Sequence, residues 1–341
     1  MEIKPIPVIR AAYLNLFLDV LNESGRNYET DLQQFNLPTT LTDKPDAYVA
    51  YKAALLFMHW GACSTGIEDF GLRAASRLQV SDFDAELRSA LLCAPTLEAA
   101  LQTFCRLAKR EQSPVRYWIV RERDEVRICS SLDALPLSST DHCGEWLQIM
   151  SLLTIIRHFA GCAWMPATIA FQSQHEPGRH ARRAFPRARF VTGQKETGIV
   201  FPASLLRGAS AMHNRRQTAA VPPDGKSRAP GQARWNFPAS LCALLQAYLD
   251  DGYPQIEFAA KIAGSSVRTL QRRLKQFDLS YSEVIKQARF EVAAHLLRDS
   301  DIKVIDASYA VGYNDPSNFA RAFRRLTGVS PKQYRAASYA Y

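Results

Sequence analysis

Hydrophobic positions follow the same spacing twice in the last quarter of the chain. When the two copies are aligned on Gly264 and Gly312, which lie 48 residues apart, their apolar positions coincide. In each copy three apolar residues recur at i, i+4 and i+7: Leu270, Leu274 and Phe277 in the first, and Phe319, Phe323 and Leu326 in the second. This spacing places the three side chains on one face of an α-helix. We therefore expect two helices that each bury one face.

Signals for the start of these helices also match between the copies. Ser266 is a good N-cap for the first, and Asp315 followed by Pro316 at the first helical position is a good start for the second. Small residues, Ala260 and Ser308, stand four positions before the two glycines, where a preceding helix must be crossed closely. Each copy therefore predicts a helix, a glycine turn and a second helix, which is the helix-turn-helix motif.

Stop signals follow both second helices. Asp278 stands where a left-handed residue is favoured after a helix, and Gly328 holds the equivalent place in the second copy. A new helix then starts in each copy, with a capping box between Ser280 and Glu283 and a cap at Ser330. The helix that joins the two units is predicted from about Ser280 to Arg298. Its apolar side is expected to consist of Val284, Ala288, Val292 and Leu296.

The exposed faces of the two second helices are basic. From Phe258 to Phe277 there are five Lys/Arg and no Asp/Glu, and the same holds from Pro316 to Tyr341. A basic run by itself is typical of a solvated helix face. Here it coincides with a duplicated helix-turn-helix, whose second helix enters the major groove of DNA. The exposed face is predicted to carry Arg268, Gln271, Arg272 and Lys275 in the first copy, and Ser317, Arg321, Arg324 and Arg325 in the second.

At these residues the chain resembles the AraC/XylS family of bacterial transcription regulators, over about residues 236–341. The most specific stretch runs from Gly312 to Arg335, while Ala307 and Ser308 depart from the family's usual larger aliphatic residue and alanine. The resemblance implies binding to double-stranded promoter DNA and contact with RNA polymerase. It places base-reading positions on Arg268, Gln271, Arg272, Ser317, Asn318 and Arg321. Phosphate contacts are expected from Ser266, Thr269, Lys275, Arg324, Arg325 and Lys332.

The rest of the chain predicts a second domain of a different kind. A length of 341 residues allows about two domains. Residues 208–235, with Pro-Pro-Asp-Gly and Ala-Pro-Gly among basic and small residues, predict a linker. Most of the net charge of +9 lies in this linker and beyond it, so residues 1–207 are close to neutral. This difference fits a sensor domain (1–207) joined to a DNA-binding domain (236–341).

Residues 1–207 mix helical and strand-like patterns, which indicates an α+β domain followed by the all-α domain with its two helix-turn-helix units. Helices are predicted at Ala11–Leu21, Asp46–Trp60, Leu97–Ala108 and Glu145–Ala160. Strands are predicted at Val115–Arg121, Val126–Ser130, Thr168–Gln172 and Gly198–Phe201.

This first domain resembles, over shorter motifs, the arabinose-binding-like N-terminal domain of one branch of the same family, which includes regulators of amino-acid catabolism and of virulence. The matching features are Phe70 to Arg73, Pro95 to Leu101, and the aromatic residues Phe171, Phe185 and Phe190. The resemblance implies effector binding or dimerisation. A pocket is one possible use of Tyr117–Val120 and Trp146–Ile156, and the alternative is that they form the core.

Enzyme and metal chemistry find little support in the sequence. A repair alkyltransferase needs Pro-Cys-His, and Asp141-His142-Cys143 has the wrong order. His175 to His180 spans a Pro-Gly pair that breaks the helix of a zinc protease. His158 and Cys162 lack a second ligand pair, so core packing is the better interpretation. We expect neither a catalytic residue nor a metal or other cofactor.

The sequence therefore predicts a cytoplasmic transcription regulator that does not associate with a membrane. Met1 to Arg10 has no apolar run typical of a signal peptide, and polar residues interrupt the apolar stretch Trp146–Met165. Seven scattered cysteines without a Cys-x-x-Cys pair fit a reducing compartment. An effector-responsive activator is favoured by the resemblance, with a homodimer as one possible state. A repressor, a constitutive architectural DNA binder and a DNA-modifying enzyme remain as alternatives.

Overall fold

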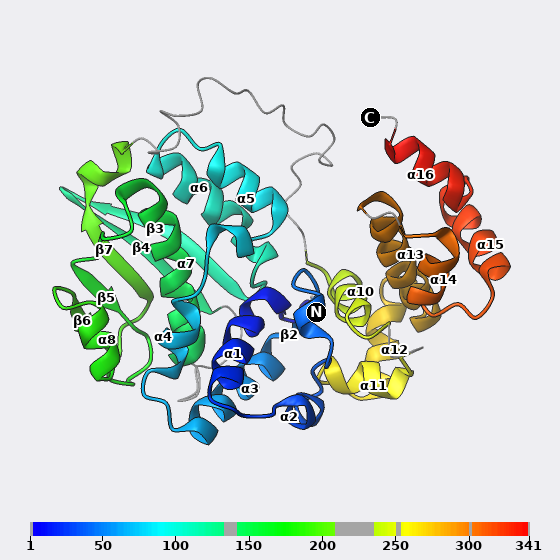
Figure 1. Cartoon of the computed structure of the whole chain (residues 1–341), viewed down its shortest axis with the longest axis horizontal. Coiled ribbons are helices and arrows are strands. Elements are labelled where there is room, and N and C mark those ends of the chain that lie inside the picture. The colour runs from blue at the N-terminus through cyan, green and yellow to red at the C-terminus, as the bar shows by residue number, and fades with distance from the viewer. Residues whose placement is uncertain (1–2, 133–141, 209–234, 250–253, 300–301, 340–341) are drawn as a thin grey trace. The chain divides into compact units, whose positions relative to one another are not determined.

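The computed structural model describes residues 3–132, 142–208, 235–249, 254–299 and 302–339 (Figure 1). The chain divides into two compact units. The N-terminal unit consists of Pro7–Asp46 and Tyr51–Arg234, and the C-terminal unit of Met1–Ile6, Ala47–Ala50 and Trp235–Tyr341. The predicted linker, residues 208–235, lies outside the described residues except for its two end positions.

The N-terminal unit is a mixed α/β domain. Its helices are α1 (Ala11–Glu23), α2 (Glu29–Gln34), α3 (Tyr51–Thr65), α4 (Phe70–Ala75), α5 (Ala85–Leu92), α6 (Leu97–Leu107), α7 (His142–Ala160) and α8 (Arg179–Ala184). Its strands are β1 (Val8–Arg10), β3 (Val115–Glu122), β4 (Glu125–Leu132), β5 (Thr168–Ala170), β6 (Arg189–Val191) and β7 (Thr197–Pro202). The predicted α+β class is confirmed.

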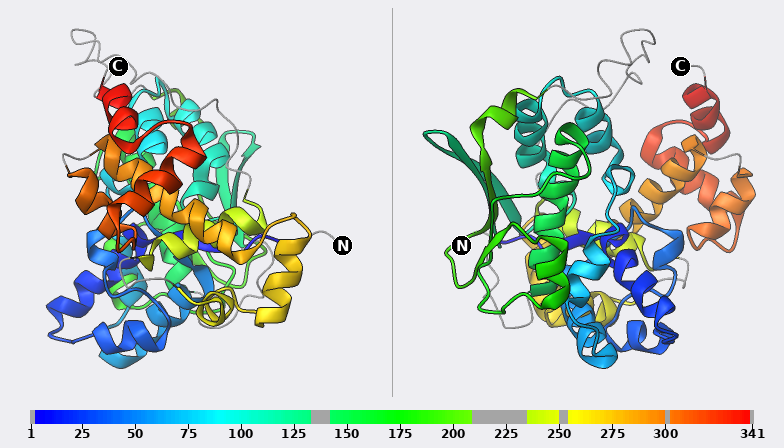
Figure 2. Two further views of the ribbon diagram at one scale, coloured as in Figure 1. Left: turned by 90° about the vertical axis from the view of Figure 1, so that its right-hand side faces the viewer. Right: turned by 60° about the vertical axis from the view of Figure 1, so that its left-hand side comes forward.

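Five of these strands form one sheet in the order β3-β4-β7-β5-β6. Only β5 and β6 run parallel among these neighbours. Because side chains alternate across a strand, Ile128, Ile199 and Ile169 point to the same face, and all three are fully buried. Helices α6 and α7 pack along one side of this sheet (Figure 2).

The predicted helices α1, α6 and α7 and the strands β3, β4, β5 and β7 are all present within a few residues of their expected ends. The helix expected over Asp46–Trp60 is wrong at its start. Residues Tyr48–Ala50 form a strand, β2, and α3 begins at Tyr51. Tyr and Val favour extended backbone, and Val49 is fully buried, so tertiary packing overrides the helical spacing there.

The family-like motifs of this unit have packing roles. Gly71 on α4 lets that helix approach α7, because a Cβ at this position would lie 2.8 Å from the Cα of Cys143. The aromatic residues of the third motif gather around α7, with the Phe171 ring 5.0 Å and the Phe185 ring 6.2 Å from that of Trp146. These motifs therefore fix how α4 and the segment after β5 pack on α7.

The C-terminal unit is helical apart from β2. Its helices are α10 (Phe237–Gln246), α11 (Ile256–Ile262), α12 (Val267–Lys275), α13 (Tyr281–Asp299), α14 (Val304–Ala310), α15 (Pro316–Thr327) and α16 (Pro331–Tyr339). Two short segments from early in the sequence belong to it. The amide of Ile6 donates to the Ser240 hydroxyl at 2.9 Å, and the ring of Tyr48 lies 5.0 Å from that of Trp235.

Candidate nucleic-acid interface

The first helix-turn-helix is formed by α11 and α12. Gly264 joins them with a φ of +62°, a conformation that glycine adopts without the strain a Cβ would bring. Ser266 caps α12 by accepting from the Thr269 amide at 3.2 Å, as predicted. Leu270 and Leu274 are buried, so the other side of α12 faces outward.

The second helix-turn-helix is formed by α14 and α15. Gly312 has a φ of +77°, and its carbonyl accepts from the Arg289 guanidinium at 3.1 Å. The same guanidinium lies 5.0 Å from the ring of Tyr313, so α13 holds the turn of this unit directly. Asp315 caps α15 by accepting from the Ser317 amide at 2.8 Å, and Pro316 occupies the first turn, both as predicted.

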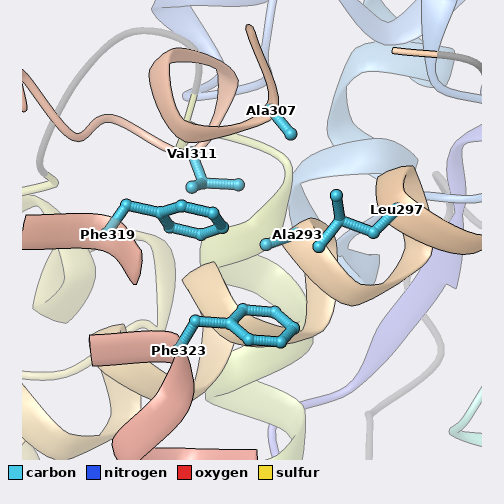
Figure 3. Close-up of a cluster of buried hydrophobic side chains, with 6 residues drawn as sticks. All are labelled: Ala293, Leu297, Ala307, Val311, Phe319 and Phe323. Atoms are coloured by element: carbon cyan, nitrogen blue, oxygen red, sulfur yellow. The ribbon is translucent and has the colours of Figure 1, made fainter. Parts of the chain in front are cut away.

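A compact core lies beneath α15 (Figure 3). Phe319 and Phe323 are each 2% exposed, and their rings lie 5.6 Å apart. Ala307 is fully buried in the same cluster, and Ser308 is fully buried beside it, so these departures from the family pattern pack closely. The cluster comprises Ala293, Leu297, Ala307, Val311, Phe319 and Phe323.

Three predicted apolar positions on α13 and α15 are less buried than expected. Leu326 was expected in the buried face of α15, but it is 49% exposed. The predicted stripe of α13 is correct at Val284 and Ala288, whereas Val292 and Leu296 are only half-buried. A step of four residues exceeds one 3.6-residue turn, so a strict i+4 row drifts around the helix. In the second half of α13 the buried positions are Ala293, Ala294 and Leu297.

The predicted stops and starts are confirmed. Asp278 has a φ of +54° and Gly328 a φ of +79°. Ser280 and Glu283 form the expected capping box, because the Ser280 amide donates to the Glu283 carboxylate at 2.7 Å and the Glu283 amide donates to the Ser280 hydroxyl at 3.3 Å. Ser330 forms a second capping box with Gln333, in the Ser-x-x-Gln pattern that also signals such a box; only the cap at Ser330 was predicted.

All six base-reading candidates have exposed side chains on α12 and α15. Within the second set, the Arg321 guanidinium donates to the Asn318 amide oxygen at 2.5 Å, which orients both side chains together. The six residues are Arg268, Gln271 and Arg272 on α12, and Ser317, Asn318 and Arg321 on α15.

The phosphate candidates are exposed as well, apart from Thr269. That residue is half-buried, and its hydroxyl accepts from Ser266 at 3.0 Å. Arg273 has a different role from the arginines on either side of it, because it is half-buried and its guanidinium lies 5.3 Å from the Phe237 ring on α10. The exposed candidates are Ser266, Lys275, Arg324, Arg325 and Lys332.

The residues weighed for catalysis do not form a reactive site. Cys143 is fully buried, and burial raises the pKa of its thiol to about 12, so the thiol stays protonated at neutral pH. His158 lies in α7, whereas Cys162 follows the end of that helix and is exposed. Asp141 lies outside the described residues. Among the residues that the structure describes, no group of three His, Cys, Asp or Glu side chains is arranged to hold a metal ion.

The residues considered for an effector pocket lie mainly in the core. Tyr117 is 5% exposed and Trp146 is 2% exposed. A hollow of about 450 Å³ lies instead against the opposite face of the sheet, where Cys129, Gly198 and Ala170 form a row across β4, β7 and β5. No helix in the described part of the chain is long and apolar enough to cross a membrane.

Comparison with known proteins agrees with this arrangement. Residues 25–209 match the model of the arabinose-binding domain of AraC transcription regulators, and residues 259–337 match a helix-turn-helix domain. The chain belongs to the AraC/XylS family of transcription regulators. It is 35% identical over 336 residues to the ornithine utilization regulator of Pseudomonas aeruginosa, covering 97% of each chain. Like its family, it is a DNA-binding regulator of transcription and not an enzyme.

Other transcription regulators are similar to part of the chain. The HTH-type transcriptional activator RhaS of Enterobacter sp. is 36% identical over 95 residues, which are 27% of this chain and 34% of RhaS. The crystal structure of the regulator CdpR from Pseudomonas aeruginosa is similar at 23% identity with a TM-score of 0.36, covering 78% of this chain and 86% of CdpR.

Proposed function

We propose that this AraC/XylS-family regulator is an effector-responsive activator that reads two successive major grooves of promoter DNA. The observation that carries the proposal is the matched pair of helices α12 and α15. Each buries apolar residues on one face and exposes three polar or basic candidates on the other. Arg and Gln make bidentate contacts with guanine and adenine, so Arg272 and Arg321 are the strongest candidates for direct base readout.

The joining helix constrains how both units meet the duplex. With 19 residues α13 is about 28 Å long at 1.5 Å per residue. Successive major grooves on one face of straight DNA lie about 34 Å apart. We propose that the duplex bends towards the protein or that one recognition helix inserts incompletely. We propose that the phosphates on either side of the bases that are read are contacted by Ser266, Thr269, Lys275, Arg324, Arg325 and Lys332.

We propose that the N-terminal unit controls this DNA binding through a small metabolite. The match to an arabinose-binding domain supports a ligand-binding role, and the RhaS likeness favours activation over repression. The relative that matches along nearly the whole chain regulates ornithine utilization, so ornithine and related amino acids are the first compounds to screen. A coupling free energy of about 1–3 kcal/mol would change operator occupancy severalfold, and DNA would change effector affinity by the same factor.

RNA polymerase is the proposed protein partner in the cytoplasm, and a homodimer would add avidity by linking two DNA-binding units. The test is a map of genomic fragments bound by the full chain, followed by reporter assays of the neighbouring promoters with and without each candidate metabolite. Rising transcription only with protein and metabolite supports the proposal. Falling transcription indicates a repressor, and binding that no metabolite alters, with unchanged transcription, indicates an architectural DNA binder.

A further inference from the structure

A dense arginine cluster lies in the N-terminal unit, although that part of the chain is nearly neutral. Residues 1–207 contain 23 Lys/Arg and 22 Asp/Glu, yet from Pro177 to Lys195 there are six Lys/Arg and no acidic residue. Five of them are arginines on α8, on β6 and between them, and all five side chains are exposed. We call Arg179, Arg182, Arg183, Arg187 and Arg189 the arginine surface. Helix α8 and strand β6 are neighbours (Figure 1), and the Arg182 guanidinium on α8 lies 6.0 Å from the ring of Phe190 on β6.

The backbone beneath this surface is held firmly. Helix α8 has only six residues, too few to be stable by itself. Its first amides are capped by carboxylates from another part of the unit. Asp69 accepts from the Gly178 and Ala181 amides at 2.8 Å each, and Glu68 accepts from the Arg179 amide at 2.8 Å. A Cβ at Gly178 would lie 2.7 Å from an Asp69 carboxylate oxygen, so a larger residue here would displace the capping carboxylate.

Buried contacts anchor the two ends of the segment. Ala181 is fully buried, and the buried Phe185 ring stacks on Trp146 with 11° between the ring planes. The segment before α8 is fixed by the buried carboxylate of Glu145, which accepts from the Gln172 amide at 2.6 Å. The arginine side chains therefore project from a backbone with a defined position. Rigid placement is what a binding surface needs, and a merely solvated charged loop does not.

Carboxylates of the protein leave most of this charge unmatched. Glu176 pairs with Arg182 at 3.2 Å. Glu68 and Asp69 lie close, but their oxygens accept from backbone amides. For the other four arginines, no ion pair is formed with any acidic side chain in the described ranges. Like charges held together disfavour the folded state, so an anionic partner would stabilise this arrangement.

We propose that the arginine surface binds the phosphate backbone of duplex DNA that flanks the operator. Five of the six basic residues from Pro177 to Lys195 are arginine, and the planar guanidinium forms paired hydrogen bonds with phosphate. The chain is a DNA-binding regulator, and covalent attachment keeps the surface at high effective concentration near the bound duplex. These contacts are independent of sequence, so they add affinity and salt dependence without adding specificity.

The experiment compares the full chain with a triple variant, Arg183→Gln, Arg187→Gln and Arg189→Gln. Binding is measured by fluorescence anisotropy from about 50 to 200 mM salt, on an operator in a duplex of ~20 bp and on the same operator centred in ~60 bp. The slope of log K against log salt is negative, and each lost phosphate contact makes it about 0.9 less steep. Three lost contacts therefore make the loss of affinity across this salt range about 40-fold smaller, on the long duplex alone.

A control variant removes the same charge elsewhere in the unit, through Lys52→Gln, Arg73→Gln and Arg106→Gln, three exposed positions. It is expected to leave the slope nearly unchanged. A second variant replaces the three arginines with lysine, which keeps the charge and is expected to retain the slope while binding more weakly. Far-ultraviolet circular dichroism and thermal unfolding establish that each variant is folded.

Equal slopes for the wild type and the glutamine variant on the long duplex would overturn the proposal. So would an equal change on both duplexes, or the same change in the control variant, because each would indicate an effect of net charge alone. Unchanged DNA binding with a loss of activation in a reconstituted transcription assay would assign the surface to an acidic protein partner instead. If the glutamine variant does not fold, the lysine variant provides the test. A weaker salt dependence of its binding to the long duplex would also refute phosphate binding.

Discussion

The packing of α15 can be tested by comparing two substitutions three residues apart on that helix, Phe323→Ala and Leu326→Ala. Phe323 is 2% exposed, and its ring lies 5.3 Å from Phe290, 5.6 Å from Phe319 and 5.3 Å from Tyr334. Removing a buried phenylalanine costs about 3–5 kcal/mol through lost burial and the cavity left behind. Three ring contacts place Phe323 at the upper end of that range.

Leu326 is 49% exposed, so its truncation is expected to lower the free energy of unfolding by less than about 1 kcal/mol. The measurement is hydrogen exchange of the α13–α16 amides in the full chain, because a two-unit protein need not unfold in one transition. Phe323→Ala should speed exchange throughout these helices and abolish operator binding, while Leu326→Ala should leave both nearly unchanged. If the two variants changed hydrogen exchange and operator binding equally, the burial assigned to these residues would be wrong and Leu326 would belong to the core.

Three further predictions test local features. Asp278→Gly should raise the free energy of unfolding by about 0.5 kcal/mol, because Asp278 has a φ of +54°, and a lower melting temperature would contradict this. Asp69→Ala should lower the free energy of unfolding by about 2 kcal/mol or more and make α8 sensitive to proteolysis. Asp43→Ala, at an exposed position, is the control, and equal digestion of both variants would show that Asp69 does not cap α8. At pH 8 iodoacetamide should modify the exposed Cys63 and spare Cys143 in the native protein, and equal labelling of the two by peptide mass mapping would contradict this. The pKa of Cys143 is about 12 in the folded protein and about 8.5 in the unfolded chain, so the free energy of unfolding should fall as pH rises above 8.5.

Elements with strong local signals could be predicted from the sequence. Glycine turns, caps and left-handed stops depend on a few neighbouring residues, so Gly264, Gly312, Asp315 and Asp278 were assigned correctly. The exposed faces of the recognition helices were predicted from the spacing of the apolar residues within each helix. Leu326 was misplaced, because near the end of a helix the neighbours that would cover a side chain come from elsewhere in the chain.

Features that depend on distant residues could not be predicted from local patterns. The short helix α8 is held by Glu68 and Asp69, more than a hundred residues earlier in the chain. Its own six residues carry no apolar periodicity long enough to predict a helix. The contact between Ile6 and Ser240 is likewise invisible in either local segment. The net charge of residues 1–207 gave no sign of the arginine surface, because acidic residues elsewhere in the N-terminal unit balance its charge.

Base readout by the two recognition helices is tested most directly by binding of Arg272→Ala and Arg321→Ala to the operator and to a random duplex of equal length. Each variant should lose about 1–3 kcal/mol on the operator, and far less on random DNA. Arg298→Ala, an exposed arginine on α13, is the control and should change neither. Equal losses on operator and random DNA would contradict the account, because they would show that Arg272 and Arg321 contact phosphates and do not read bases.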